Sequence, residues 1–105
     1  MKTKTAVIAL KAKGDKAGIK TLAYQVSQIV ATTIDTDTQI IDCIITFGGV
    51  KDVLREVKKL DAQKRFDYLI IYSPAQIAQN ALEYQQFMDV LESDFKIEVR
   101  CLRAG

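Results

Sequence analysis

Two short and almost uninterrupted apolar runs constrain the fold of this chain more than any other feature of its sequence. They span Ile40–Ile45 and Tyr68–Tyr72, and only Asp42 interrupts them with a charge. Such runs are typical of strands that are covered on both faces, as the strands of a parallel sheet usually are. We therefore expect both runs to be buried strands of a parallel sheet.

Segments with helical periodicity separate the predicted strands. The pattern is clearest in Val50–Leu60, where apolar residues recur along one side of the helix. This alternation predicts an α/β fold with right-handed crossovers, helices on both faces of the sheet, and Val7 and Ile70 on adjacent central strands. The predicted strands are Thr5–Leu10, Gln39–Ile45, Tyr68–Tyr72 and Lys96–Leu102, and the predicted helices are Ile19–Ala31, Val50–Leu60 and Pro74–Asp94.

The residue pattern also predicts the faces and ends of these elements. The first helix carries its apolar residues, Ile19 and Val30 among them, on one side, and the last strand alternates like an edge strand with one wetter face. The sequence Ser73-Pro74-Ala75-Gln76 has the form of a capping box with proline at the first helical position. We expect loops at Gly14–Gly18 and Thr32–Thr38.

The composition is that of a soluble globular protein. Apolar residues make up 49% of the 105 residues and charged residues 27%, which suffices for one buried core. The formal charge of +2 is too small to indicate a nucleic-acid-binding surface by itself. From the length we expect a single domain, 1–105. The sequence has no recognisable signal peptide or membrane span, so we expect the protein in the cytoplasm.

The chain offers little for metal or redox chemistry. It has no histidine and only two cysteines, Cys43 and Cys101, each inside an apolar run. A redox pair or a metal site needs closer spacing or further ligands, so we expect both cysteines to be buried and to act as small apolar residues. No metal ion and no cofactor is expected.

One segment has the order of a known family signature. Phe66–Asn80 contains an aspartate, an apolar strand, and then Ser-Pro-Ala-Gln-Ile-Ala-Gln-Asn. It resembles the strand and loop of the serine recombinases (resolvases and invertases), in which the loop reads Ser-Leu-Asp-Arg-Leu-Ala-Arg-Asn. In addition, Ala6–Lys13 is similar to the family's first strand, which ends Tyr-x-Arg-x-Ser, Thr21–Gln25 to the opening of its first helix, Ser-Leu-x-x-Gln, and Lys51–Leu54 to the start of its second, Arg-Pro-x-Leu. The resemblance covers nearly the whole chain and implies a three-layer resolvase-like domain with a mainly parallel sheet in the order 2-1-3-4.

The reactive residues of that family are replaced in this chain. Lys13 stands at the position of the nucleophilic serine, and Lys11 at that of the nearby arginine. Lys51 matches the arginine that opens the second helix, while Gln76 and Gln79 match the two loop arginines. A protonated amine is no nucleophile, and a neutral amide lacks the bidentate charge that a guanidinium offers to phosphate. We therefore expect no catalytic residue, and interpret these five positions as a vestigial active site.

An alternative use of this region is anion binding. Lys11, Lys13 and Lys51 could converge with Gly48 and Gly49 at a helix start and bind a phosphate of DNA or of a nucleotide. The competing interpretation is a solvated basic loop.

From the resemblance we expect a catalytically inactive resolvase-like domain that acts by protein contact in DNA recombination of a mobile element, through self-association or regulation of a recombinase. The chain stops at Gly105, so neither the family's long dimer helix nor its helix-turn-helix DNA-binding domain is expected, and DNA binding should be weak at most. One alternative is an active or vestigial recombinase in which another residue, such as Ser73, carries the chemistry, although a helix cap explains Ser73 better. The other is a small anion- or nucleotide-binding module.

Overall fold

The structure is a computed structural model of the 105-residue chain, and it describes residues 4–12, 16–34 and 36–103. Its strands form one parallel sheet in the order β2-β1-β3-β4. This confirms the predicted α/β fold and strand order. The elements are β1 (Lys4–Lys11), α1 (Lys16–Thr33), β2 (Thr38–Thr46), α2 (Val50–Gln63), β3 (Tyr68–Ile71), α3 (Pro74–Ile77), α4 (Ala81–Val90), a π-helical turn (Leu91–Phe95) and β4 (Glu98–Cys101).

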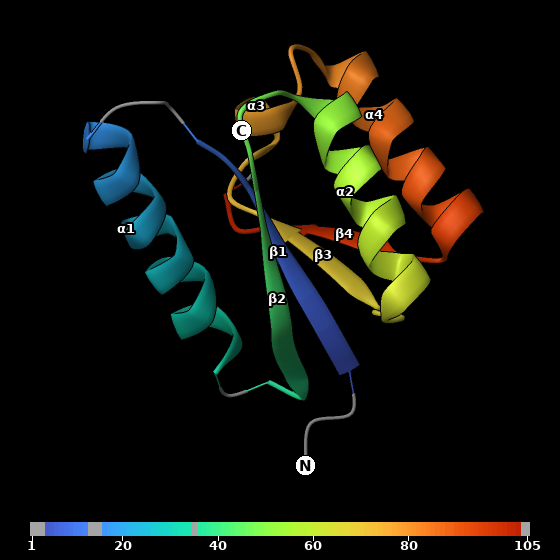
Figure 1. The fold of residues 1–105 in the computed structure, drawn as a ribbon, viewed down its shortest axis with the longest axis horizontal. Helices are drawn as coiled ribbons and strands as arrows, with labels where there is room; N and C mark the ends of the chain where they lie inside the picture. Colours follow the sequence, from blue (N-terminus) through green and yellow to red (C-terminus); the bar gives the residue numbers. More distant parts are fainter. Residues whose placement is uncertain (1–3, 13–15, 35, 104–105) are drawn as a thin grey trace.

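Helices cover both faces of the sheet. Figure 1 shows α1 on one side, and α2 and α4 together on the other. The central strand β1 is buried on both faces: Val7 packs in the cluster that includes α2 and α4, and Ile8 packs in the cluster that includes α1. Ile8 pairs with Ile70 of β3 and Val7 with Leu69, which confirms that Val7 and Ile70 lie on adjacent central strands.

The aspartate that precedes β3 joins the beginnings of the two central strands. The Asp67 carboxylate accepts hydrogen bonds from the Thr5 main-chain N–H at 2.9 Å and from the Thr5 hydroxyl at 3.3 Å. In return, the Asp67 N–H donates to the Thr5 carbonyl oxygen at 2.9 Å. Asp67 therefore fixes the register of β1 and β3, far from the carboxyl ends of the strands.

The prediction that β2 is covered on both faces is confirmed only in part: Ile44 is buried on the α2 side and Ile40 packs on the α1 side, but β2 is an edge strand. It pairs with β1 alone, and Asp42, Cys43 and Ile45 are exposed. The expectation that both cysteines are buried is wrong for the same reason: Cys43 is exposed on one edge strand, and Cys101 is only half-buried on the other, β4. An apolar run does not distinguish an edge strand from a central one. The predicted edge position of the last strand is confirmed.

The first helix is longer than predicted and differs in its buried face. It begins at Lys16, inside the predicted loop, and Leu22, Val26 and Ile29 pack against the sheet. Val30, expected on the same side, is exposed, and the side chain of Ile19 lies outside the described part of the structure. Within the described residues, no helix is both long and apolar enough to cross a membrane.

The third predicted helix is broken into two helices. α3 begins at Pro74 as predicted, but it ends at Ile77, and Ala78 is extended. α4 then begins after Asn80, whose side-chain oxygen accepts a hydrogen bond from the Glu83 N–H at 2.8 Å. An asparagine at this position satisfies a free N–H group of a new helix, so it favours a fresh start over a continuous helix. The break places a short irregular segment beside the carboxyl end of β3.

Candidate functional site

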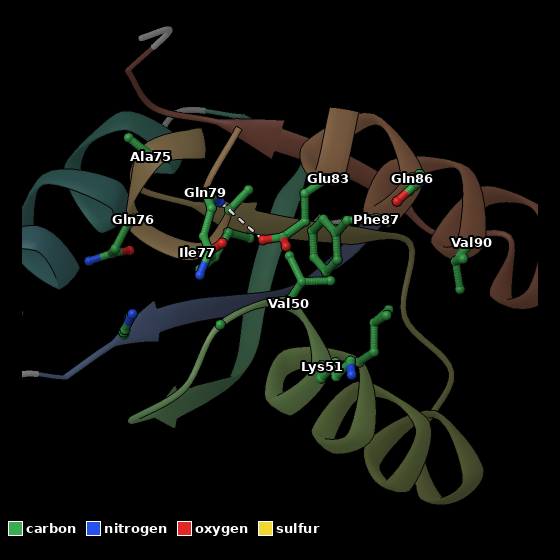
Figure 2. A pocket seen from close by; sticks show the side chains of 14 residues that line it. Val50, Lys51, Ala75, Gln76, Ile77, Gln79, Glu83, Gln86, Phe87 and Val90 are labelled. Carbon is green, nitrogen blue, oxygen red and sulfur yellow. Dashed lines mark hydrogen bonds between the residues drawn. The ribbon is translucent and has the colours of Figure 1, made fainter. Parts of the chain in front are cut away.

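A groove of about 800 Å³ lies between α2, α3 and α4 at the carboxyl ends of the central strands. This edge is where ligands bind in open α/β sheets. Figure 2 shows its lining: Val50 and Phe87 lie in the middle, and Gln79 and Glu83 lie on the side of α3 and α4. The lining residues are Lys11, Gly49, Val50, Lys51, Leu54, Ala75, Gln76, Ile77, Ala78, Gln79, Glu83, Gln86, Phe87 and Val90.

Most of the positions identified from the sequence meet in this groove. Lys11 comes from the end of β1, Gly49 and Lys51 from the start of α2, and Gln76 and Gln79 from α3 and the segment after it. Gly48 is not among the lining residues, and Lys13 lies outside the described residues. The four described positions that the resemblance assigns to one vestigial site thus lie together, although they come from three separate elements.

Gln76 does not point its amide along the groove toward a shared ligand. Its Nε2 donates to Oε1 of Gln25 on α1 at 2.7 Å, so the side chain joins α3 to α1 (Figure 2 shows it directed away from Gln79). Gln25 is buried, with 9% of its surface exposed, whereas Gln76 is half-buried. The Oε1 of Gln76 is itself buried and has no hydrogen-bond partner in the described part of the chain. Gln25 ends the segment that resembles Ser-Leu-x-x-Gln, but no local pattern in the sequence indicates this contact.

This contact also corrects the predicted capping box. Ser73 does occupy the N-cap position of α3 with Pro74 after it, but its side chain makes no capping hydrogen bond. Because the Gln76 side chain turns toward Gln25, it cannot complete the box. Ser73 instead lines a second hollow together with Lys11, Gln25 and Gln76.

The main-chain group of Gln79 takes part in the real capping arrangement. Its N–H donates to Oε1 of Glu83 at 3.0 Å, drawn as a dashed line in Figure 2, while the Glu83 N–H donates to the Asn80 side chain. Reciprocal bonds of this kind fix the first turn of a helix. Asn80-Ala81-Leu82-Glu83 is the sequence signal that could have located the break, because it places a capping residue three positions before a glutamate.

The positive charge among the described residues of the groove comes from two lysines. Lys11 and Lys51 are both exposed, and no ion pair between described residues involves either of them. The sequence predicts that a third lysine, Lys13, converges with these two to bind an anion. Lys13 lies outside the described residues. Two solvated ammonium groups can attract an anion weakly and without directional binding.

The start of α2 is poorly suited to bind an anion. The Asp52 carboxylate, in the first turn, lies where a side chain at position 48 would be placed, and it accepts a hydrogen bond from Arg55 at 2.8 Å. A negative charge already occupies the positive end of this helix dipole. On the other side, a Cβ at Gly49 would lie 2.9 Å from the Ile77 carbonyl oxygen, so α2 and α3 touch here through main chain.

The lining of the groove, as the structure describes it, contains no hydroxyl, thiol or imidazole side chain. The chain has no histidine to act as a base, and the groove lining contains amides, lysines, apolar residues and one carboxylate that caps a helix. Ser73, which lines the second hollow, has no imidazole to activate it, because the chain has no histidine. No protein-family model matches the sequence, and no curated protein or solved structure is significantly similar to it.

Proposed function

We propose that this chain is a catalytically inactive, resolvase-like domain that acts through protein contact in DNA recombination of a mobile element. The support is the resemblance of the sequence pattern, together with a parallel sheet whose strand order is the one that the resemblance implies. Of the residues that the resemblance matches to the family's reactive positions, Lys11, Lys51, Gln76 and Gln79 line one groove at the carboxyl edge of that sheet, and Lys13 lies outside the described residues.

The observation that carries the proposal is the contact between Gln76 and Gln25. In the resemblance, Gln76 takes the place of an arginine that would neutralise a phosphate in the transition state. Here its amide is occupied in joining α3 to α1, at a donor–acceptor distance of 2.7 Å. Each donor lost from a developing charge costs about 10²–10³ in rate, and a lysine at the nucleophile's position removes the covalent route. The Gln76 side chain thus serves packing where the family would use an arginine for chemistry.

The surface of the domain carries exposed apolar side chains that another protein could cover. Several large apolar side chains are exposed outside the groove, on α1, on and after β2, and on α4; they are Tyr24, Val30, Ile34, Ile45, Phe47 and Leu82. Phe47 alone has 73% of its surface exposed. Of these, Val30 and Ile45 belong to the contact surface inferred below.

A recombination assay tests the proposal. An active serine recombinase and a plasmid with two of its sites are incubated with and without this chain, and the recombinant product is followed over time. We expect the chain to change the rate without cutting the plasmid when the recombinase is left out. A chain without effect over a wide concentration range would refute the proposal, as would cleavage by the chain alone.

A second candidate function, binding of a phosphate group, is supported by one observation. Lys11 and Lys51 line the same groove without an ion pair among the described residues. The Asp52 carboxylate at the start of α2 argues against phosphate binding, because its negative charge repels a phosphate. We rank this candidate second, and a salt titration described below tests it.

A further inference from the structure

The edge strand β2 directs the main-chain groups of alternate residues away from the sheet. Since the Thr46 carbonyl oxygen bonds to β1, the alternate residues Cys43 and Ile45 direct their main-chain groups away from the sheet. Before the bulge, the Asp37 carbonyl oxygen bonds to β1, so Ile40 also directs its groups outward. Ile40, Cys43 and Ile45 thus form an open row on one edge of the sheet.

A bulge gives this row an internal symmetry. Ala6 of β1 pairs with Ile40 and the next residue, Val7, pairs with Asp42, so Ile41 is one extra residue in β2. With Ile41 and Asp42 counted as one position, Ile40 and Ile45 lie equally far from Cys43 along the strand. All three residues pair with β1 residues of the cluster on the α1 side, so their side chains share one face.

From this symmetry we infer that β2 is the site at which two copies of this chain associate, strand against strand and antiparallel, about a two-fold axis at Cys43. In that register each Ile40 lies opposite the Ile45 of the second copy, and Cys43 lies opposite Cys43 with outward main-chain groups facing each other. The two sheets then form one continuous sheet. A closed two-fold contact needs such a self-complementary surface.

The flanks of β2 agree with a second copy as the occupant. On the α2 side, Glu56 and Lys59 lie beside β2, where they line a hollow with Asp42–Ile45. A two-fold axis through the centre of β2 brings the α2 helices together antiparallel, with Glu56 of each chain near Lys59 of the other. Within one chain Glu56 and Lys59 already form an ion pair, with Lys59 Nζ 3.5 Å from Glu56 Oε1, so the axis sets two such pairs side by side with opposite charges facing each other.

On the α1 side, the flank is apolar. Thr21 and Gln25 line the hollow beside Ser73, which places that flank of α1 over β3. Val30 lies on the other flank by the helical period, over the β2 edge, and it is 41% exposed. Together with Ile45, 52% exposed, it gives the association an apolar contact on this face.

Asp42 limits this association. Its Oδ1 accepts a hydrogen bond from the Cys43 N–H at 2.8 Å, which is one of the groups that the second copy would use. A charge at a bulge is a common guard of an exposed strand edge. When the dimer forms, the Cys43 N–H therefore gives up its hydrogen bond to the Asp42 carboxylate and donates to the Cys43 carbonyl oxygen of the second copy. The loss of the Asp42 hydrogen bond lowers the affinity of the two copies for each other.

The biological role of this association rests on the proposed function. Sedimentation analysis over a concentration series tests the association itself. The chain of 11.7 kDa should show a reversible monomer–dimer equilibrium. Ile45→Lys should weaken it by at least about tenfold, because each copy loses an apolar contact and two like charges enter the interface. The matched control Leu82→Lys, on α4 and 68% exposed, should leave it unchanged. Asp42→Ala should tighten it about three- to tenfold, because the Cys43 N–H becomes free.

Oxidative crosslinking tests the register. Residues in a hydrogen-bonded antiparallel pair have Cα atoms about 5.5 Å apart, which is within the range that a disulfide spans. A diazene oxidant such as diamide removes two electrons and two protons from the two Cys43 thiols and becomes the hydrazine, while the sulfurs join. Because desolvation and the Asp42 carboxylate raise the pKa of the Cys43 thiol, the reaction is run in mildly alkaline buffer. A dimer band should appear without reductant, persist in Cys101→Ser, and vanish in Cys43→Ser.

The outcomes separate the two proposals. A chain that stays monomeric in Asp42→Ala at high concentration, or a dimer that Ile45→Lys leaves intact, overturns the association. A crosslink that depends on Cys101 overturns the register. None of these results bears on whether the chain alters the rate of a recombinase or cuts DNA, which is how the proposed function fails.

Discussion

Replacement of Gln25 by leucine should destabilise the domain, because the side-chain amide of Gln76 then lacks its hydrogen-bond acceptor. Gln25→Leu keeps the size of a buried side chain but removes the acceptor of the Gln76 Nε2, whose bond is 2.7 Å long. An unsatisfied polar group costs about 1–3 kcal/mol, and because Gln76 is half-buried we expect the lower part, about 1–2 kcal/mol. For a domain of this size that corresponds to a fall in Tm of roughly 4–16 °C.

Urea unfolding followed by far-ultraviolet circular dichroism measures this effect. The control is Gln86→Leu, an exposed glutamine of the same groove, which should change the free energy of unfolding by less than about 0.5 kcal/mol. The double variant Gln25→Leu/Gln76→Leu should recover most of the loss, since both partners are then apolar. If Gln25→Leu is as mild as the control, or the double variant is worse than the single one, the contact between α1 and α3 does not have the structural role assigned to it.

Three further predictions concern the groove and its helix starts. Asn80→Ala should lower the free energy of unfolding by about 1 kcal/mol, because α4 loses its N-cap, and Asn80→Asp should not; equal losses in urea unfolding would contradict this. Gly49→Ala should cost about 1–3 kcal/mol, because its Cβ would press on the carbonyl oxygen of the last α3 residue, whereas Gly48→Ala meets only a side chain that can swing aside; equal thermal stability of the two would refute the close approach. Lys11→Ala/Lys51→Ala should reduce the salt dependence of any weak DNA binding measured by fluorescence anisotropy, and an unchanged slope would exclude the groove as a phosphate site.

The sequence predicts the arrangement of the sheet well because two signals agree, namely the apolar runs of the strands and the helical periodicity between them. Alternating apolar strands and amphipathic helices require right-handed crossovers, and these place the strands of Val7 and Ile70 side by side, as observed. The same reasoning brought Lys11, Lys51, Gln76 and Gln79 to one edge, since the carboxyl ends of parallel strands meet there.

Other features depend on tertiary contacts that a single sequence does not reveal. The apolar run of β2 predicts burial, but the strand lies at the edge, and Cys43 and Ile45 are exposed as a result. The pairing of Gln76 with Gln25 joins residues that are far apart in the sequence, and no local pattern indicates it. The break before Asn80 is different in kind: its capping signal is local and was outweighed by the longer apolar periodicity of the segment.

The central claim, that this domain is catalytically inactive in strand exchange, is tested most directly by trapping on DNA. The chain is incubated with intact and with nicked DNA carrying a serine-recombinase site, denatured, and separated by electrophoresis, beside an active recombinase as the positive control. We predict no protein–DNA band from this chain, because position 13 carries a lysine and the groove provides no activated hydroxyl. A band that survives denaturation and disappears in Ser73→Ala would contradict the claim, because it would show a serine of this chain joined to a DNA phosphate.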